Sequence, residues 1–109
     1  MDYETRFYFI ALFDYYWKLL TKKQQNYFKL YYFNDLSLAE IASENNVSRT
    51  AISDAMKHIL EDLKYYEEKL ELYNKSLQRL KLYEQLPNND LKIKLIELEH
   101  KGKGIENEK

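Results

Sequence analysis

The 109-residue chain contains no cysteine, one proline and two glycines. The absence of cysteine excludes a disulfide framework and a thiolate metal site. Glycine and proline are so scarce that few β-turns can form, and the sequence therefore predicts an all-α fold. Hydrophobic residues make up 45% of the chain, which is enough for the core of one domain with an extended appendage.

No long hydrophobic run is present, so no segment is expected to insert into a membrane or span it. The first residues, Met1 to Glu4, lack the basic start of a signal peptide. These two features together predict a soluble protein of the cytoplasm.

No excess of either charge is present, with 17 lysines and arginines against 18 aspartates and glutamates. Neutralisation of phosphates supplies much of the affinity of proteins for nucleic acids, and a basic surface is its usual sign. No long segment of this chain is markedly basic. Nucleic-acid binding would therefore depend on a local patch, on dimerisation or on a partner.

Residues for catalysis or cofactor binding are also missing. The two histidines, His58 and His100, have no cysteine or carboxylate partner at metal-ligand spacing. The two glycines, Gly102 and Gly104, lie close to the C-terminal end and form no phosphate-binding loop. No nucleophile, base and oxyanion-stabilising group come together, so we expect no enzyme, no metal site and no cofactor.

The most informative stretch covers residues 36–54, LSLAEIASENNVSRTAISD. Ser37 and Glu40 fit a capping box at the start of a short helix. The Asn-Asn pair at 45–46 predicts its end, because asparagine tolerates the left-handed backbone conformation. Ser48 can cap a second helix directly after it. A short helix, a tight turn and a second helix are typical of a helix-turn-helix, whose second helix can enter the major groove of DNA.

The two faces of this motif have different predicted roles. Helical spacing places small or apolar side chains at the seam between the helices, namely Ile41, Ala42, Val47, Ile52 and Ala55. The opposite face would meet base edges or phosphates, and it carries Ser48, Arg49, Thr50, Ser53 and Lys57. The alternative interpretation is that two helices pack at a corner and bind no ligand.

Two further helices are predicted before the motif. A helix over residues 3–20 carries a stripe at helical spacing that consists of Phe7, Ile10, Phe13, Trp17 and Leu20. Phe9, Leu12 and Tyr16 broaden this stripe, so more than one face of the helix is expected to be covered. Thr21 and Gln24 then fit a second capping box. The helix that follows has an expected inner face of Tyr27, Phe28, Tyr31 and Tyr32 and ends at Asn34-Asp35.

The helix that begins at Arg49 is predicted to be long. No glycine or proline occurs before Pro87, so a continuous helix over 49–86 would extend about 57 Å. Its apolar stripe continues beyond what a small head can cover, which predicts a homodimer. After Met56 and Ile59, the stripe runs through the expected dimer contacts Leu63, Tyr66, Leu70, Tyr73, Leu77 and Leu80. A parallel pair would place Asp62 beside Glu67 of the partner, so an antiparallel or splayed pair is favoured.

After Pro87 the sequence predicts a turn and a short last helix that Asp90 can cap. This helix can fold back on the long one, and its apolar stripe consists of Leu91, Leu95 and Leu98. Gly102 is expected to end it, and residues 101–109 are expected to fray. The predicted parts of the chain are a helix-turn-helix head at 1–56, a dimerisation helix at 57–86 and a C-terminal part at 87–109.

Four stretches of the sequence resemble the YlxM-type family of small bacterial helix-turn-helix proteins. They are LFDYY at 12–16, LTKKQ at 20–24, LYYFNDLSLAEIA at 30–42 and VSRTAISD at 47–54. The resemblance extends over residues 12–73 and leaves the part after Pro87 uncovered. Proteins of this family are similar to the promoter-reading region four of sigma factors.

This resemblance implies an all-helical fold with a long terminal helix and dimerisation. It also implies a regulatory role around the signal recognition particle, because genes of the family tend to neighbour the gene for the particle's GTPase. The sigma-like motif would place the five outward residues, Ser48, Arg49, Thr50, Ser53 and Lys57, at the nucleic acid. The family brings no catalytic residues. Asp54 opposes direct binding, because a carboxylate next to Ser53 repels phosphate more often than it accepts from a base.

Two functions therefore remain open. The first is a regulator that binds DNA or the RNA of the signal recognition particle through residues 48–57. The second is a protein-interaction module that binds the particle's GTPase or its receptor without reading nucleic acid. The motif favours the first and the balanced charge favours the second, since a fold alone does not determine a function. A dimeric spacer with a purely structural role is a third possibility.

Overall fold

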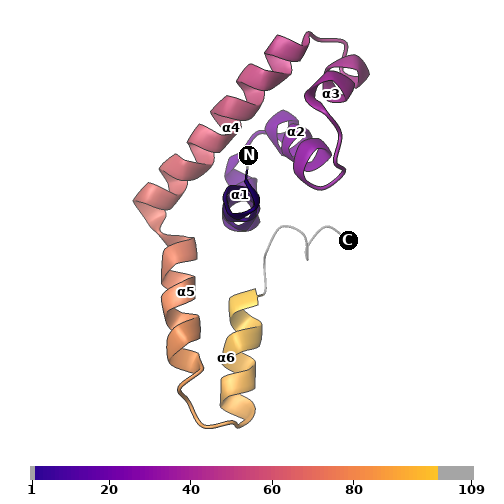
Figure 1. Cartoon of the computed structure of the whole chain (residues 1–109). Coiled ribbons are helices and arrows are strands. Elements are labelled where there is room, and N and C mark those ends of the chain that lie inside the picture. The colour runs from indigo at the N-terminus through magenta and orange to yellow at the C-terminus, as the bar shows by residue number, and fades with distance from the viewer. Residues whose placement is uncertain (1, 101–109) are drawn as a thin grey trace.

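The computed structural model describes residues 2–100, and every regular element in this range is a helix (Figure 1). The predicted all-α fold is therefore confirmed. The elements are the α-helices α1 (Tyr3–Tyr16), α2 (Lys22–Tyr32), α3 (Leu38–Glu44), α4 (Arg49–Leu70), α5 (Leu72–Tyr83) and α6 (Asp90–His100), and the short 3₁₀ helix η1 (Trp17–Leu19). No helix in the described range is long and apolar enough to cross a membrane. The expectations for Gly102 and for residues 101–109 lie outside the described residues.

The first three helices and the part of α4 up to Leu63 form a head around one hydrophobic core (Figure 1). Aromatic rings fill its centre. The ring of Phe28 is stacked on that of Phe13, with centroids 4.2 Å apart, and on that of Tyr32, with centroids 4.3 Å apart. Burial raises the pKa of Tyr32 to about 12. Because α4 supplies one wall of this core, the second helix of the helix-turn-helix is fixed rigidly to the head.

The buried face of α1 differs from the predicted stripe. Phe13 is buried as expected, but Phe7 is 56% exposed. The side chains that enter the core are Phe9, Leu12, Phe13 and Tyr16, at the i, i+3, i+4, i+7 spacing of one helix face. Leu20 of the predicted stripe is buried as well. The buried face is therefore centred on the residues that were expected to broaden the stripe, because α2 and α4 approach α1 from that side.

The capping box at the start of α2 is confirmed. The backbone N–H of Gln24 donates to Thr21 Oγ1 (3.1 Å), and the N–H of Thr21 donates to Gln24 Oε1 (2.9 Å). At the other end, Arg6 of α1 donates to the carbonyl of Tyr32 (2.8 Å) and pairs with Asp35 (3.2 Å). A side chain of α1 thus satisfies the end of α2, where Asp35 takes a left-handed φ of 56° and turns the chain toward α3.

The prediction of a continuous helix over 49–86 is wrong, because the chain leaves α-helical geometry at Glu71. This residue has φ 53° and ψ 31°, a left-handed conformation that costs a non-glycine residue about 1–2 kcal/mol. The cause is tertiary: Tyr16 and Glu67 accept hydrogen bonds from the first N–H groups of α5, which a continuous helix would use itself. The expected rod is a bent arm, in which α5 turns toward the side of α4 that carries the head (Figure 1).

The apolar stripe of the long arm is divided between two environments. Leu63 is completely buried in the core of its own chain, so it has no surface left for a second copy. Leu70 and Leu77 are exposed. The half-buried members of the stripe are Tyr66, Tyr73 and Leu80. Much of the regularity of the stripe therefore comes from packing within the chain.

Helix α6 folds back along α5, as predicted (Figure 1). Its cap is Asn89 and not Asp90, because Asn89 Oδ1 accepts the N–H of Lys92 at 3.1 Å. Leu95 of the predicted stripe is half-buried, but Leu91 and Leu98 are exposed, so the prediction of a buried face is wrong at these two positions. The chain folds back through the turn at Pro87 with a different side of α6 inward.

A polar cluster around Glu99 joins α6 to α5. Ser76 Oγ donates to its carboxylate at 2.7 Å, and Arg79 and the hydroxyl of Tyr83 donate to it as well. The hydrogen bond from Arg79, followed by those from Ser76 and Tyr83, lowers the pKa of Glu99 to about 2. Charge and hydrogen bonding thus hold this hairpin together.

Candidate functional site

The helix-turn-helix is built from α3, a tight turn and the start of α4. Glu40 N–H donates to Ser37 Oγ (3.0 Å) and Ser37 N–H donates to Glu40 Oε1 (2.9 Å), which confirms the capping box. The bonds from Ser37 lower the pKa of the Glu40 carboxyl. Asn46 has a left-handed φ of 56°, as the Asn-Asn pair predicted. Ser48 Oγ then accepts the N–H of Ala51 (3.0 Å) and caps α4.

Most of the predicted seam between these two helices is buried. Ile41, Ala42 and Ile52 lie in the core, and Ala55 is half-buried. Val47 is 39% exposed, so its predicted burial at the seam is wrong. Its backbone closes the corner instead, because the N–H of Val47 donates to the carbonyl of Ala42 at 3.1 Å.

The five candidate nucleic-acid contacts are all exposed. Ser48 already acts as the helix cap, so its side chain has a structural role at this position. The remaining four share the outward side of the first turns of α4 and are Arg49, Thr50, Ser53 and Lys57. The fold thus presents one compact polar face at the start of the second helix.

A shallow apolar hollow of about 260 Å³ adjoins this face. Ser53 and Lys57 form one side of it, and Tyr31 of α2 and Leu38 of α3 form the other. Leu60 lies at the same hollow one turn further along α4. No pattern in the sequence predicts this hollow, because three separate helices contribute to it.

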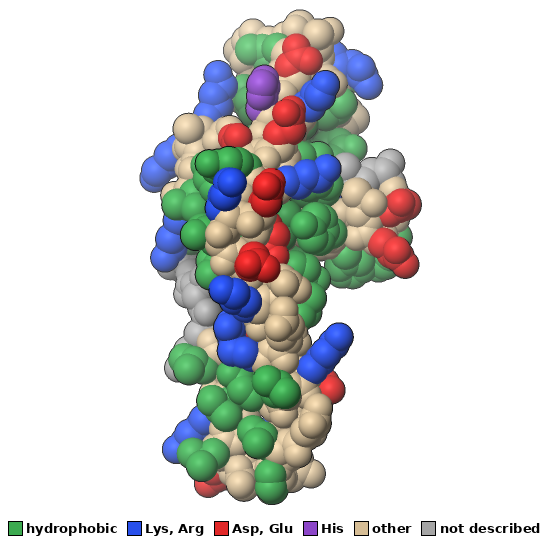
Figure 2. Space-filling model, turned by 90° about the vertical axis from the view of Figure 1, so that its left-hand side faces the viewer, with side chains coloured by type: hydrophobic (Ala, Val, Ile, Leu, Met, Phe, Trp, Pro, Cys, Tyr) green, Lys and Arg blue, Asp and Glu red, His purple; other side chains and the backbone are tan. Residues whose placement is uncertain are grey.

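Charge along the outward side of α4 is mixed. Asp54, Glu61 and Glu68 follow one another at intervals of seven residues, so these exposed carboxylates lie along one line of the helix. Figure 2 shows acidic and basic side chains interspersed on this side of the molecule, with no continuous basic area in view. Arg49 and Lys57 are therefore local cations beside an acidic line.

By its fold and by the geometry of this turn, the protein is a helix-turn-helix protein. The family model described as "Putative helix-turn-helix protein, YlxM / p13 like" matches residues 3–102. The chain therefore belongs to this UPF0122 family, which confirms the resemblance seen in the sequence. The family description names no enzymatic activity.

Similar proteins occur in several bacteria. A UPF0122 protein of Ureaplasma urealyticum serovar 10 is 46% identical over 90 residues, which are 83% of this chain and 91% of the relative. One from Malacoplasma penetrans is 47% identical over 88 residues, or 81% and 82% of the two chains. One from Listeria innocua serovar 6a is 53% identical over 75 residues, or 69% and 68%.

Proposed function

We propose that this protein is a regulator that binds nucleic acid through the first turns of α4, in the cytoplasm. One observation carries the proposal. The side chains of Arg49, Thr50, Ser53 and Lys57 are exposed together at the start of the second helix of a helix-turn-helix. This is the part of the motif that contacts base edges in helix-turn-helix complexes.

The electrostatics set the expected strength of this binding. One head offers Arg49 and Lys57, next to Asp54 and Glu61. If a dimer presents two such heads, about four phosphates are neutralised, and the logarithm of the binding constant falls with the logarithm of salt at a slope of about −3.6 on duplex DNA. We therefore expect weak binding at physiological salt and readily measurable binding only at low salt.

Arg49→Ala should weaken this binding at least about fivefold and reduce the magnitude of the salt slope by about 1 for each site lost. The measurement is fluorescence anisotropy of labelled DNA and of labelled signal recognition particle RNA, titrated at several salt concentrations. Lys75→Ala is the matched control, because Lys75 is an exposed cation on α5, far along the chain from the turn. Absence of binding to either nucleic acid at low salt would remove the proposal.

A homodimer is the second part of the proposal, and the α5–α6 hairpin supports it. Neither helix of this hairpin contains a buried hydrophobic side chain, and its one buried residue is Ser76. Isolated helices of this length are marginal in water, so the hairpin needs an apolar surface from elsewhere. Its exposed large apolar residues, with Leu70 at the end of α4, are Leu72, Leu77, Leu82, Leu86, Leu91, Ile93 and Leu98. Two such hairpins can cover each other in a four-helix bundle.

Leu77→Glu should convert the dimer to a monomer, because a carboxylate cannot be buried in an apolar contact without a partner. Multi-angle light scattering of the wild type and the variant measures this directly. Leu19→Glu is the control, because Leu19 is a comparably exposed leucine on the head and should leave the dimer intact. A monomeric wild type at micromolar concentration would contradict this part of the proposal.

The second candidate function is a protein-interaction module for the GTPase of the signal recognition particle or its receptor. The mixed charge of α4 and the apolar hollow beside Ser53 favour it, since apolar pockets anchor partner side chains. The link to the particle itself rests on the family resemblance. A pull-down with purified, nuclease-treated components separates the candidates, because capture that survives nuclease treatment belongs to the second one alone.

A further inference from the structure

The junction of α4 and α5 interrupts a sequence that can form one helix. Residues 49–86 contain no glycine or proline, and Glu71 is a good helix former. Nevertheless Glu71 takes a left-handed conformation at φ 53°. The backbone preference of Glu71 does not explain this conformation, so the bend must be held by side-chain contacts at the junction.

Two side chains take over the hydrogen bonds that the bend breaks. The hydroxyl of Tyr16 donates to Glu67 Oε1 (2.6 Å) and accepts the N–H of Leu72 (3.0 Å). The Glu67 carboxylate also accepts the N–H groups of Tyr73 (3.1 Å) and Asn74 (3.0 Å). In a continuous helix these three N–H groups would bond to the carbonyls four residues earlier. Tyr16 and Glu67 therefore replace one turn of helical hydrogen bonds.

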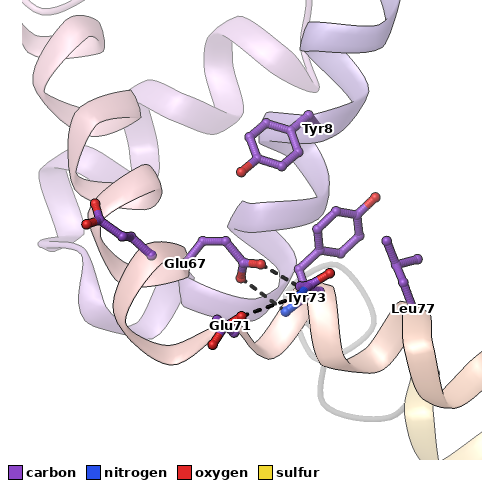
Figure 3. A pocket seen from close by; sticks show the side chains of 7 residues that line it. Tyr8, Glu67, Glu71, Tyr73 and Leu77 are labelled. Atoms are coloured by element: carbon purple, nitrogen blue, oxygen red, sulfur yellow. Dashed lines mark hydrogen bonds between the residues drawn. The ribbon is translucent and has the colours of Figure 1, made fainter.

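Contacts between aromatic rings add to these hydrogen bonds on the side of the junction that faces the head. The ring of Tyr73 lies 6.0 Å from that of Tyr8 and 6.0 Å from that of Tyr15, both of α1. Beside them is an open hollow of about 380 Å³ between Tyr8, Glu67 and Leu77, which Figure 3 shows at the junction. On one side the bent arrangement rests on Tyr16, which is buried in the core, and on its other side the junction borders open space.

We infer that the α4–α5 junction is a hinge with two positions, latched in its bent position by Tyr16 and Glu67. In the second position Glu71 is α-helical and α4 and α5 form one helix over 49–83. Straightening moves Tyr73 off α1 and carries the α5–α6 hairpin away from the head. With the proposed function, on which this consequence rests, the hinge sets the spacing of the two heads in a dimer joined by its hairpins.

Double electron–electron resonance tests the hinge in the full-length chain. The sequence has no cysteine, so spin labels can be placed cleanly at Asn26→Cys on α2 and Gln78→Cys on α5, both exposed positions. Labelled chains are diluted with unlabelled ones, so that distances within one chain dominate. The unsubstituted background should give one main distance, that of the bent position. Tyr16→Phe should raise the population of a longer distance, that of the straight position, at least about fivefold. Tyr27→Phe, at a buried tyrosine of α2, should leave the distribution unchanged.

Substitutions at Glu71 provide an independent second test. Glu71→Gly relieves the left-handed conformation and should keep the one main distance of the bent position, whereas Glu71→Ala favours the continuous helix and should add the longer distance. Distributions that coincide for Tyr16→Phe, Glu71→Gly and Glu71→Ala would overturn the hinge. If Tyr16→Phe does not fold by circular dichroism, the difference between Glu71→Gly and Glu71→Ala decides alone. Light scattering separates the two proposals, because two distances in a monomer would support the hinge and remove the dimer.

Discussion

Replacement of Glu67 by alanine is expected to lower the free energy of unfolding by about 3 kcal/mol, because each buried hydrogen-bonding group left without a partner costs roughly 1–3 kcal/mol. The substitution removes the acceptor of three donors at once, which are the hydroxyl of Tyr16 and the N–H groups of Tyr73 and Asn74. Water at the open side of the junction offsets part of this cost, and so does straightening of the hinge, which returns the N–H groups of Tyr73 and Asn74 to helical carbonyls. In thermal unfolding followed by circular dichroism, the midpoint should fall by roughly 12–20 °C for a domain of this size.

Two variants show whether the carboxylate itself is responsible. Glu68→Ala removes the neighbouring exposed carboxylate and should change stability by no more than about 0.5 kcal/mol. Glu67→Gln keeps one acceptor oxygen but points an amide donor at the other, so its effect should lie between those of Glu67→Ala and the wild type. Equal effects of Glu67→Ala and Glu68→Ala would show that the bend does not depend on this hydrogen-bonded carboxylate.

The elements that the sequence predicted well are those whose causes are local. The capping boxes of Thr21 with Gln24 and of Ser37 with Glu40 involve residues three positions apart, so the pattern and the contact coincide. The left-handed Asn46 follows from its own side chain in the same way. The helix-turn-helix could therefore be located correctly from sequence, down to the residue that caps each helix.

The bend at Glu71 could not be predicted, because its cause is remote. Tyr16 lies 51 residues before Glu67 in the chain, and the residues around 71 are ordinary helix formers. The same limit applies to the stripe of α4. An apolar spacing of three and four residues indicates burial but not the partner, and Leu63 is buried by its own chain. The outward face of the candidate site follows from helical spacing, whereas the hollow beside it depends on how α2, α3 and α4 cross.

Phe13→Ala should be among the most destabilising substitutions in this protein, with a loss of about 3–5 kcal/mol in the free energy of unfolding. Phe13 is 1% exposed. Its ring is stacked on that of Phe28, centroids 4.2 Å apart, and meets that of Phe33 edge-on, centroids 5.8 Å apart. Truncation leaves a cavity at the point where α1, α2 and the turn toward α3 meet. Chemical denaturation should show the loss as a lower midpoint with little change in slope.

Phe7→Ala is the matched control, since it is the same substitution in the same helix and in the same predicted stripe. Phe7 is 56% exposed and touches Tyr3 at the start of α1, with centroids 4.7 Å apart. Little apolar surface is lost there, so we expect a loss below about 1 kcal/mol. The sequence pattern alone predicts burial of both side chains, because it does not determine the rotation of α1 about its own axis relative to α2 and α4. A cost at Phe7 as large as that at Phe13 would mean that α1 packs through the predicted stripe, and the placement of Tyr16 at the hinge would fail with it.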